Sequence, residues 1–184
     1  MTDKISYPKF FQVLHWLTLI LIVFTVALVL IRDEIEGKAI RLALINNHRS
    51  VGVIILVLLI VRVIAKFVIR KKIPDHGLTP ILDLAAKFHH LLMYLVLLSL
   101  PLLGWAQTSA AGKTVSIFGW INLPSIVKED SDFSETLADY HQNAAWLLLA
   151  LVLVHVIAAL WHHFVRKDNV LKSMLGTSKT ITKF

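Results

Sequence analysis

Histidine is the residue type in this chain with the widest chemical scope. There are nine histidines among 184 residues, and two of them, His141 and His155, are 14 positions apart. On a helix, 14 residues turn through about 1400°, about 40° short of four full turns. The two imidazoles therefore share one helix face, about 21 Å apart along its axis. Because neutral imidazole is a common metal ligand, this face can hold two metal centres at different heights.

The composition places that helix in a membrane. Hydrophobic residues make up 57% of the chain and the mean hydropathy is +0.71, whereas soluble domains contain about 45–50% apolar residues. Four apolar stretches are each long enough to cross a bilayer core of about 30 Å at about 1.5 Å per residue. They predict an all-α, four-helix membrane bundle with helices over about 10–31, 51–69, 84–106 and 140–164.

Two further histidines match the two heights. His48 is expected at the outer end of the second helix, level with His141, and His15 about two turns into the first helix, near the depth of His155. Each level then has two imidazoles from different helices, which is the ligation that a low-spin haem needs. Ionisable groups at membrane depth are costly and therefore functional candidates. The pattern predicts two b-type haems stacked across the membrane.

Small and basic residues near these levels also fit a haem. Gly52 follows His48 by four residues on the same helix face, and glycine lets a flat ring approach the backbone closely. Arg62 lies toward the far end of the second span, where its guanidinium can bind a haem propionate or extend to the water interface. Arg41 and Arg49 offer the same contacts at the outer level.

His162 follows His155 by seven residues and stays on the same face, at the rim of the bundle. There it can hydrogen-bond a quinone carbonyl or a propionate, while an interfacial histidine beside Trp161 fits the spacing equally well. His163 is its neighbour in the sequence. The spacing alone leaves these alternatives open.

His89 and His90 begin the third helix at the inner level. One of them can compete with His15 as a ligand or bind a propionate, although a hydrated helix end is the simpler interpretation. His76 lies in a loop with proline and glycine and is expected to be solvated.

Lysine and arginine counts predict the orientation. The N-terminus, the loop near residues 70–87 and the C-terminal tail, with the adjoining span ends, hold 13 of the 19 basic and 4 of the 12 acidic residues. The opposite side holds 6 basic and 8 acidic residues, so the two sides carry +9 and −2. The positive side is expected to face the cytoplasm, with both termini. Topology thus accounts for the net charge of +7 without a nucleic-acid partner.

The chain has no cysteine, which excludes disulfides, thiolate metal sites and covalently attached haem c. The longest connection covers 107–139, and its segment 112–123 fits either a short hairpin or a stretch at the membrane interface. This connection contains a cluster of five acidic residues: Glu129, Asp130, Asp132, Glu135 and Asp139.

Short motifs surround these histidines along nearly the whole chain. The most specific is His155-x6-His162-His163-Phe164, followed by Lys167-Asp168-Asn169-x-Leu171. The others are Leu14-His15-Trp16-Leu17, Asn47-His48-Arg49-Ser50-Val51-Gly52, Val61-Arg62 with Lys66, His90-Leu91 through Tyr94, Pro101-Leu102-Leu103-Gly104 and Asp139-Tyr140-His141. Together they resemble the bacterial cytochrome b561 family, within the broader group of four-helix dihaem cytochrome b subunits. The resemblance implies one transmembrane domain over 1–184.

The resemblance also implies site residues and a function. His48 and His141 would ligate the outer haem, and His15 and His155 the inner haem, in a multi-pass protein of the bacterial inner membrane. One branch of the family oxidises superoxide and passes electrons to ubiquinone, with a quinone site at the position of His162. We therefore expect electron transfer between the quinone pool and a periplasmic-side redox partner, in either direction.

If the chain is an enzyme, superoxide:ubiquinone oxidoreductase is the concrete form that the resemblance suggests. The acidic outer segment would repel superoxide, an anion, unless basic side chains line a local funnel. The outer basic residues available for such a funnel are Arg41, Arg49, Lys113 and Lys128.

Two other functions fit parts of the pattern. A cytochrome subunit that accepts electrons from a periplasmic dehydrogenase or hydrogenase would share the haems and use the acidic 107–139 segment for docking. A histidine-lined metal-ion or proton transporter would need carboxylates beside the histidines, and the central turns of the four spans contain no Asp or Glu. A homodimer is also compatible, because four helices hardly enclose two haems.

Overall fold

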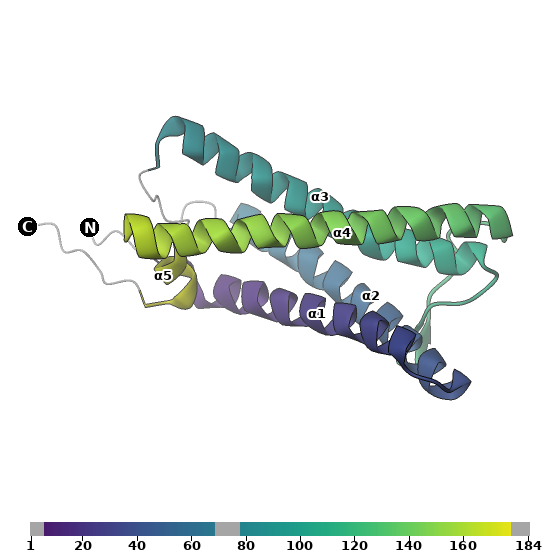
Figure 1. The fold of residues 1–184 in the computed structure, drawn as a ribbon. Coiled ribbons are helices and arrows are strands. Elements are labelled where there is room, and N and C mark those ends of the chain that lie inside the picture. The colour runs from purple at the N-terminus through teal and green to yellow at the C-terminus, as the bar shows by residue number, and fades with distance from the viewer. Residues whose placement is uncertain (1–5, 69–77, 178–184) are drawn as a thin grey trace, which may run out of the picture.

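The computed structural model describes residues 6–68 and 78–177. Its long helices are α1 (Lys9–Glu34), α2 (Lys38–Val68), α3 (Pro80–Ala110) and α4 (Ser131–Trp161), followed by a π-helical turn η2 (His162–Arg166) and the short α5 (Val170–Leu175). Each of these four helices is long and apolar enough to cross a membrane, and they lie side by side in Figure 1. The predicted all-α membrane bundle is confirmed.

The helices continue past the apolar stretches at the outer end of the bundle. The second begins at Lys38 rather than near 51, and the fourth at Ser131 rather than near 140. His48 and His141 each lie ten residues after these starts, about 15 Å into their helices. The apolar stretches mark only the most hydrophobic part of each helix, so they missed the start of α2, where Lys38, Arg41, Asn46 and Asn47 alternate with apolar residues, and the polar first turns of α4.

A side-chain cap fixes the start of α4. The Oδ1 atom of Asp130 accepts a hydrogen bond from the N–H of Phe133 at 2.9 Å, which satisfies one of the unpaired donors at a helix start. Asp132 lies in the first turn, where the helix dipole favours negative charge. Part of the acidic cluster therefore has a structural role.

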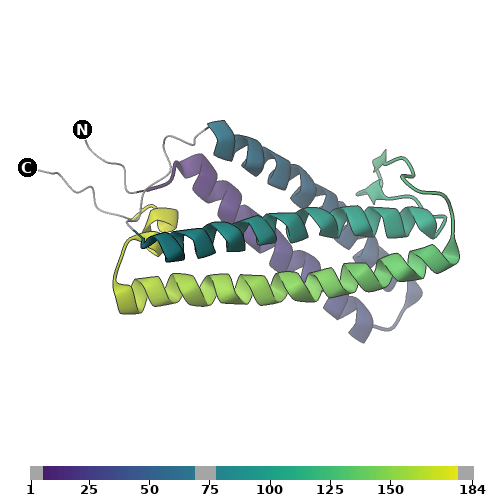
Figure 2. The same cartoon turned by 90° about the horizontal axis from the view of Figure 1, so that it is seen from above.

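The four helices pack as two pairs. Helix α1 runs along α2 and α3 runs along α4, while α2 also packs against α3; Figure 2 shows α3 and α4 in front of the other pair. Among the described residues, α4 has only sparse backbone contact with α1 and α2. The interactions that join α4 to the first pair are therefore made through side chains.

An apolar layer fills the middle of the bundle. Its buried members come from all four helices, and Leu148 on α4 is 5% exposed. Leu148 is seven residues from both His141 and His155, so it lies midway between the two predicted ligand levels. The other buried members are Ile22, Val51, Ile55 and Val96. The part of the bundle between the two levels is therefore mainly apolar.

The segment 112–123 forms a hairpin, one of its two predicted alternatives. Strand β1 (Ser116–Ile117) pairs antiparallel with β2 (Ile121–Asn122). The loop between the strands is residues 118–120, in which Phe118 and Gly119 have positive φ and the N–H of Trp120 donates to the Ile117 carbonyl at 3.0 Å. The hairpin is held to α2 by the buried Ser50 hydroxyl, which accepts the N–H of Phe118 at 2.9 Å and lies 3.1 Å from the Ser116 carbonyl oxygen.

Helix α5 returns the chain to the start of α1 (Figure 1). The indole N–H of Trp16 donates to the Met174 carbonyl at 3.1 Å, and the Gln12 amide donates to the Ser173 carbonyl at 3.0 Å. The two ends of the described chain therefore share one end of the bundle, in agreement with the predicted topology. His76 lies outside the described residues.

Candidate functional site

The outer histidines meet across the bundle. The ring centroids of His48 on α2 and His141 on α4 are 6.0 Å apart, with the ring planes at 73°. A metal ion between two imidazoles holds the ring centroids about 6 Å apart, given two bonds of about 2 Å and roughly 1 Å from each nitrogen to its ring centre. The pair therefore has the spacing of two axial ligands.

Each outer imidazole is also oriented by a backbone carbonyl. The Nδ1 atom of His48 lies 3.0 Å from the Thr25 carbonyl oxygen and 3.1 Å from its hydroxyl. The Nδ1 atom of His141 lies 2.9 Å from the Leu100 carbonyl oxygen. Because a carbonyl only accepts, Nδ1 carries the proton in both rings and Nε2 keeps its lone pair. Metal-binding histidines commonly donate their second nitrogen in this way.

Two glycines border the outer pair. A Cβ atom at Gly104 would lie 3.3 Å from Cε1 and 3.4 Å from Nδ1 of His141, so glycine lets this ring lie close against α3. A Cβ atom at Gly52 would meet no atom within 4 Å. Gly52 therefore borders open space one turn from His48, as a site for a flat ring requires.

Arginine side chains surround the outer level. Arg32 and Arg49 lie close enough to His48 and to each other to interact electrostatically. Arg49 donates to the Asn46 amide oxygen at 3.2 Å, and Arg32 pairs with Asp33 at 2.6 Å. Arg41 is exposed on the first turn of α2. Of these cations, Arg49 forms no ion pair with a described carboxylate.

The inner histidines form a larger group. The ring centroids of His15 on α1 and His155 on α4 are 6.1 Å apart, again the spacing of two axial ligands. His89 and His90 on α3 also lie beside His155, with centroid distances of 6.1 and 5.4 Å. The structure thus brings together four imidazoles from three helices, and distance alone does not choose between His15 and its competitors.

Helix packing distinguishes these candidates. His89 and His90 come from α3, which packs directly along α4, whereas α1 has at most sparse backbone contact with α4 among the described residues. The candidate partners of His155 thus differ in how closely the backbones of their helices approach α4. The remaining imidazole groups still offer polar contacts: His90 Nδ1 lies 2.7 Å from the Ala86 carbonyl, and His89 Nε2 is buried without a partner.

Arg62 lies beside the inner pair without a carboxylate partner in the described part of the chain. Its Nη2 atom donates to Nδ1 of His15 at 2.9 Å, and its guanidinium lies 5.3 Å from the Phe11 ring centroid and 5.8 Å from that of Tyr94. The Nε atom is buried and has no hydrogen-bond partner. Lys66 lies over the same Tyr94 ring at 5.1 Å. Two cations at this level therefore await an anionic partner.

The Arg62 contact sets His15 apart from the outer ligands. Because arginine only donates, Nδ1 of His15 is the acceptor in this hydrogen bond, and Nε2 carries the proton of the neutral ring. Ligation through Nε2 therefore requires Arg62 to release His15. An anion that draws the guanidinium away provides the means.

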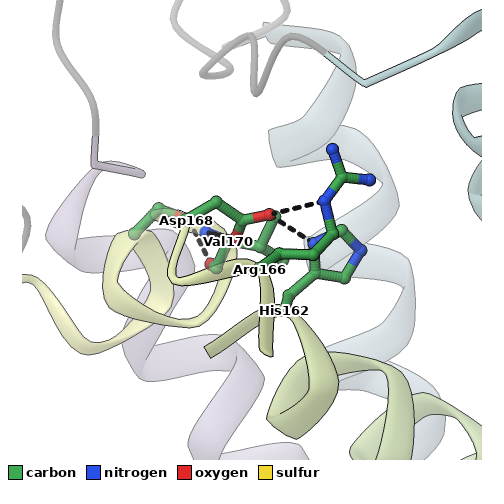
Figure 3. A network of polar contacts seen from close by, with 5 residues as sticks. His162, Arg166, Asp168 and Val170 are labelled. Atoms are coloured by element: carbon green, nitrogen blue, oxygen red, sulfur yellow. Dashed lines mark hydrogen bonds and ion pairs between the residues drawn. The ribbon is translucent and has the colours of Figure 1, made fainter. Parts of the chain in front are cut away.

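His162 is held by Asp168, which the sequence analysis named within a motif but gave no role. The Nδ1 atom of His162 lies 2.5 Å from Oδ2 of Asp168, and Arg166 lies 3.8 Å from the same oxygen; Figure 3 shows these side chains with Val170. The contact spans six residues, and it forms because η2 is a π-turn and Lys167 has positive φ. π-Helical turns often occur at functional sites.

The Asp168 carboxyl is an anion at neutral pH. Partial burial raises its pKa, but the hydrogen bonds from His162 and from the N–H of Val170, with the charges of His162 and Arg166, outweigh this effect. The pKa therefore lies below its usual value. The second oxygen, Oδ1, accepts from the Val170 N–H at 3.1 Å at the start of α5.

The donor sets match a haem better than a bare metal ion. Within residues 6–68 and 78–177, no group of three or more His, Asp or Glu side chains is arranged to hold a metal ion. Two facing imidazoles are too few ligands for a bare ion, but they are what a haem iron needs in addition to its macrocycle. The outer pair fits this requirement as it stands.

Comparison with known proteins gives the family. A family model described as prokaryotic cytochrome b561 matches residues 6–177. Cytochrome b561 homolog 2 of Escherichia coli K12 is 32% identical over 133 residues, which are 72% of this chain and 71% of the relative. Cytochrome b561 homolog 1 of the same strain is 30% identical over 171 residues, or 90% of this chain and 94% of the relative.

A third relative is described as a probable superoxide oxidase. This Yersinia pestis protein is 30% identical over 171 residues, which cover 88% of this chain and 91% of the relative. The family match and the four membrane-spanning helices agree with the histidine pairs described above. The chain therefore belongs to the prokaryotic cytochrome b561 family and is a multi-pass protein of a bacterial inner membrane that carries b-type haem and transfers electrons.

Proposed function

We propose that this chain transfers electrons across the inner membrane through two b haems, between the quinone pool and a periplasmic redox partner. The observation that carries the proposal is the pair of imidazole couples, with ring centroids 6.0 and 6.1 Å apart, on either side of one apolar layer. When bound, the two haems would pass single electrons between the two membrane faces. His48 and His141 would hold the outer haem, and His15 and His155 the inner one.

Residues around each histidine pair would orient the imidazoles, leave space for the haem and bind its propionates. Thr25 and the Leu100 carbonyl orient the outer imidazoles, and Gly52 and Gly104 leave room beside them. At the inner level, Arg62 has an unpartnered Nε atom, and we propose that it binds a haem propionate as a bidentate donor. Arg62 would then leave His15, whose Nε2 atom becomes free to ligate iron.

The close contact at Gly104 leads to a specific expectation. Gly104→Ala should displace the His141 ring by a few tenths of an ångström and shift or weaken the absorption of the outer haem, while the inner haem is unchanged. Alanine is favoured over glycine in a helix by about 1 kcal/mol, so a general loss of helix stability is not expected. Reduced-minus-oxidised spectra and haem content per chain measure the effect. Two unchanged haem signals would show that the ring does not need this space.

At the inner face, we propose that the protonated ring of His162 donates a hydrogen bond from Nε2 to a quinone carbonyl. Its Nδ1 atom is engaged by Asp168, and none of the described residues forms a hydrogen bond with its Nε2 atom. The side chain is 13% exposed, so it is sheltered yet lies at the end of a membrane-spanning helix. Nε2 is therefore positioned to exchange a proton with a bound quinone.

His162→Ala should retain both haems and slow their oxidation by ubiquinone about 100-fold, because a positioned proton donor contributes about 10²–10⁴-fold to such steps. Stopped-flow mixing of the dithionite-reduced protein with decylubiquinone measures this rate. The matched control is His163→Ala, the adjacent histidine, which should react like the wild type. If His162→Ala reacts at the wild-type rate, the quinone site lies elsewhere.

The outer reactant is superoxide in our proposal, on the basis of the superoxide oxidase relative. Arg49 near His48 forms no ion pair with a described carboxylate and supplies local positive charge, and the dipole of α4 partly offsets the negative charge of Asp130 and Asp132 at its start. The acidic cluster therefore opposes an incoming anion less than its charge count suggests. Superoxide should reduce the oxidised haems in purified protein within the mixing time, and no reduction would favour another outer partner.

The alternative outer partner is a periplasmic dehydrogenase or hydrogenase. The exposed hairpin residue Trp120, 92% exposed, is the kind of side chain that such a partner contacts. A protein that copurifies in stoichiometric amounts and reduces the haems with its own substrate would support this alternative.

A further inference from the structure

We propose that Asp168 is a positioning residue for the quinone reaction: its carboxylate fixes the proton of His162 on Nδ1 and stabilises the imidazolium that donates from Nε2. This inference rests on the proposed quinone site at His162. Asp168 would then be a second residue of the quinone site. This role differs from its contact with the Val170 N–H at the start of α5.

The geometry supports a directed pair. Oδ2 of Asp168 is 2.5 Å from Nδ1 of His162, and a carboxylate at neutral pH can only accept, so Nδ1 must be the donor. That contact determines the tautomer and the ring orientation, and it leaves Nε2 on the opposite edge of the ring. In Figure 3 the carboxylate reaches the ring from the loop that follows η2.

Exposure increases along the pair from the imidazole to the carboxylate. The side chain of His162 is 13% exposed, that of Asp168 24% and that of Arg166 33%. The carboxylate thus lies nearer the aqueous phase at the end of the bundle where both ends of the described chain lie. Protons from water can reach the imidazole from this side without crossing the apolar layer.

The chemistry of the step explains why a carboxylate is useful there. Reduction of a quinone to a quinol takes up two electrons and two protons, and the electrons come from the haems of the proposed function. His162 gives one proton from Nε2 to the nearer quinone oxygen and is reprotonated from the aqueous side, and the second quinone oxygen takes its proton from water at that end of the bundle. A buried imidazolium is unfavourable without a nearby anion, so Asp168 lowers the free energy of the proton-donating form. The reverse sequence applies to quinol oxidation.

A purely structural role has to be separated from this one. Oδ1 of Asp168 accepts from the Val170 N–H at 3.1 Å at the start of α5, and α5 is in turn fixed to α1 through Trp16 and Gln12. Asparagine retains an oxygen acceptor for this cap but loses the charge. Asp168→Asn therefore tests the pair and spares the cap, while Asp168→Ala removes both.

The experiment is a double-mutant cycle on the rate at which decylubiquinone oxidises the dithionite-reduced haems. Asp168→Asn alone should slow the rate at least tenfold, by less than His162→Ala, and should retain two haems per chain. In the His162→Ala background, Asp168→Asn should have no further effect, because Asp168 acts through that ring. The control Asp83→Asn removes a carboxylate that pairs with Lys87 at 2.6 Å at the same end of the bundle, and it should react like the wild type.

Each outcome identifies what fails. If Asp168→Asn reacts at the wild-type rate while His162→Ala is slow, the quinone site stands and the role of Asp168 is wrong. If Asp168→Asn slows the reaction equally in both backgrounds, Asp168 acts through α5 and not through His162. If His162→Ala itself reacts at the wild-type rate, the proposed quinone site fails first.

Discussion

Replacing His141 with alanine is expected to remove the outer haem and leave the inner one. The imidazole faces that of His48, with the two ring centroids 6.0 Å apart, and alanine offers no ligand. Haem content should fall from about two to about one per chain, with about half of the α-band absorbance lost. Pyridine haemochrome assays and reduced-minus-oxidised spectra of the detergent-purified protein measure both quantities.

The control for this change is Gln142→Ala, which alters the adjacent, exposed residue on the same turn of α4. It should keep both haems. If His141→Ala retained two haems and unaltered spectra, His141 would not be a haem ligand. Its contact with the Leu100 carbonyl would then not serve to orient a ligand.

The second large effect is expected at the inner level. His155→Ala should abolish the inner haem and disconnect the quinone end of the path, because His155 is the residue around which the other three imidazoles gather. Haem content should again fall to about one per chain, and decylubiquinone should no longer oxidise the remaining haem rapidly. Retention of both haems would contradict the assignment of His155.

The partner of His155 can be identified in the same assay. His15→Ala should remove the inner haem, whereas His90→Ala and His89→Ala should keep it, because their helix α3 packs directly along α4. If His90→Ala is the variant that loses the haem, His15 is the polar neighbour and His90 the ligand.

The spacing of the histidines correctly predicted which imidazole rings lie close together; that these rings ligate haem stays a prediction. The 14-residue interval between His141 and His155 and the pairing of levels depend only on helix geometry, and the structure brings His48 to His141 and His15 to His155. The helix ends were less predictable, since basic and amide residues interrupt the apolar ones before His48, the turns before His141 are polar, and both lie beyond the continuous apolar stretch.

Groups that support the ligands could not be predicted from residue types. The Leu100 carbonyl that accepts from His141 is a backbone atom, and every residue has one. Thr25 gave a faint signal as a polar residue in an apolar run, but its contact with His48 depends on how α1 packs along α2. The Asp168–His162 contact depends on a π-turn and a left-handed residue, which regular helix periodicity does not describe.

At the inner level, pairing histidines by their predicted depth in the membrane was not enough to identify the partner of His155. His15, His89 and His90 all lie near the depth of His155, and depth does not distinguish the helix that leaves room for a macrocycle. Among the described residues, α3 packs directly along α4, whereas α1 has at most sparse backbone contact with it. Such a difference in helix packing cannot be predicted from the depth of a histidine in its helix.

The central claim is that two haems are bound by four histidines at two levels. The most direct measurement is the haem content per chain of the purified wild-type protein, determined together with its reduced-minus-oxidised spectrum. Two b-type haems per chain, reduced to one by either His141→Ala or His155→Ala, is the predicted result. A single haem in the wild type, or a haem content unaffected by both substitutions, would contradict it.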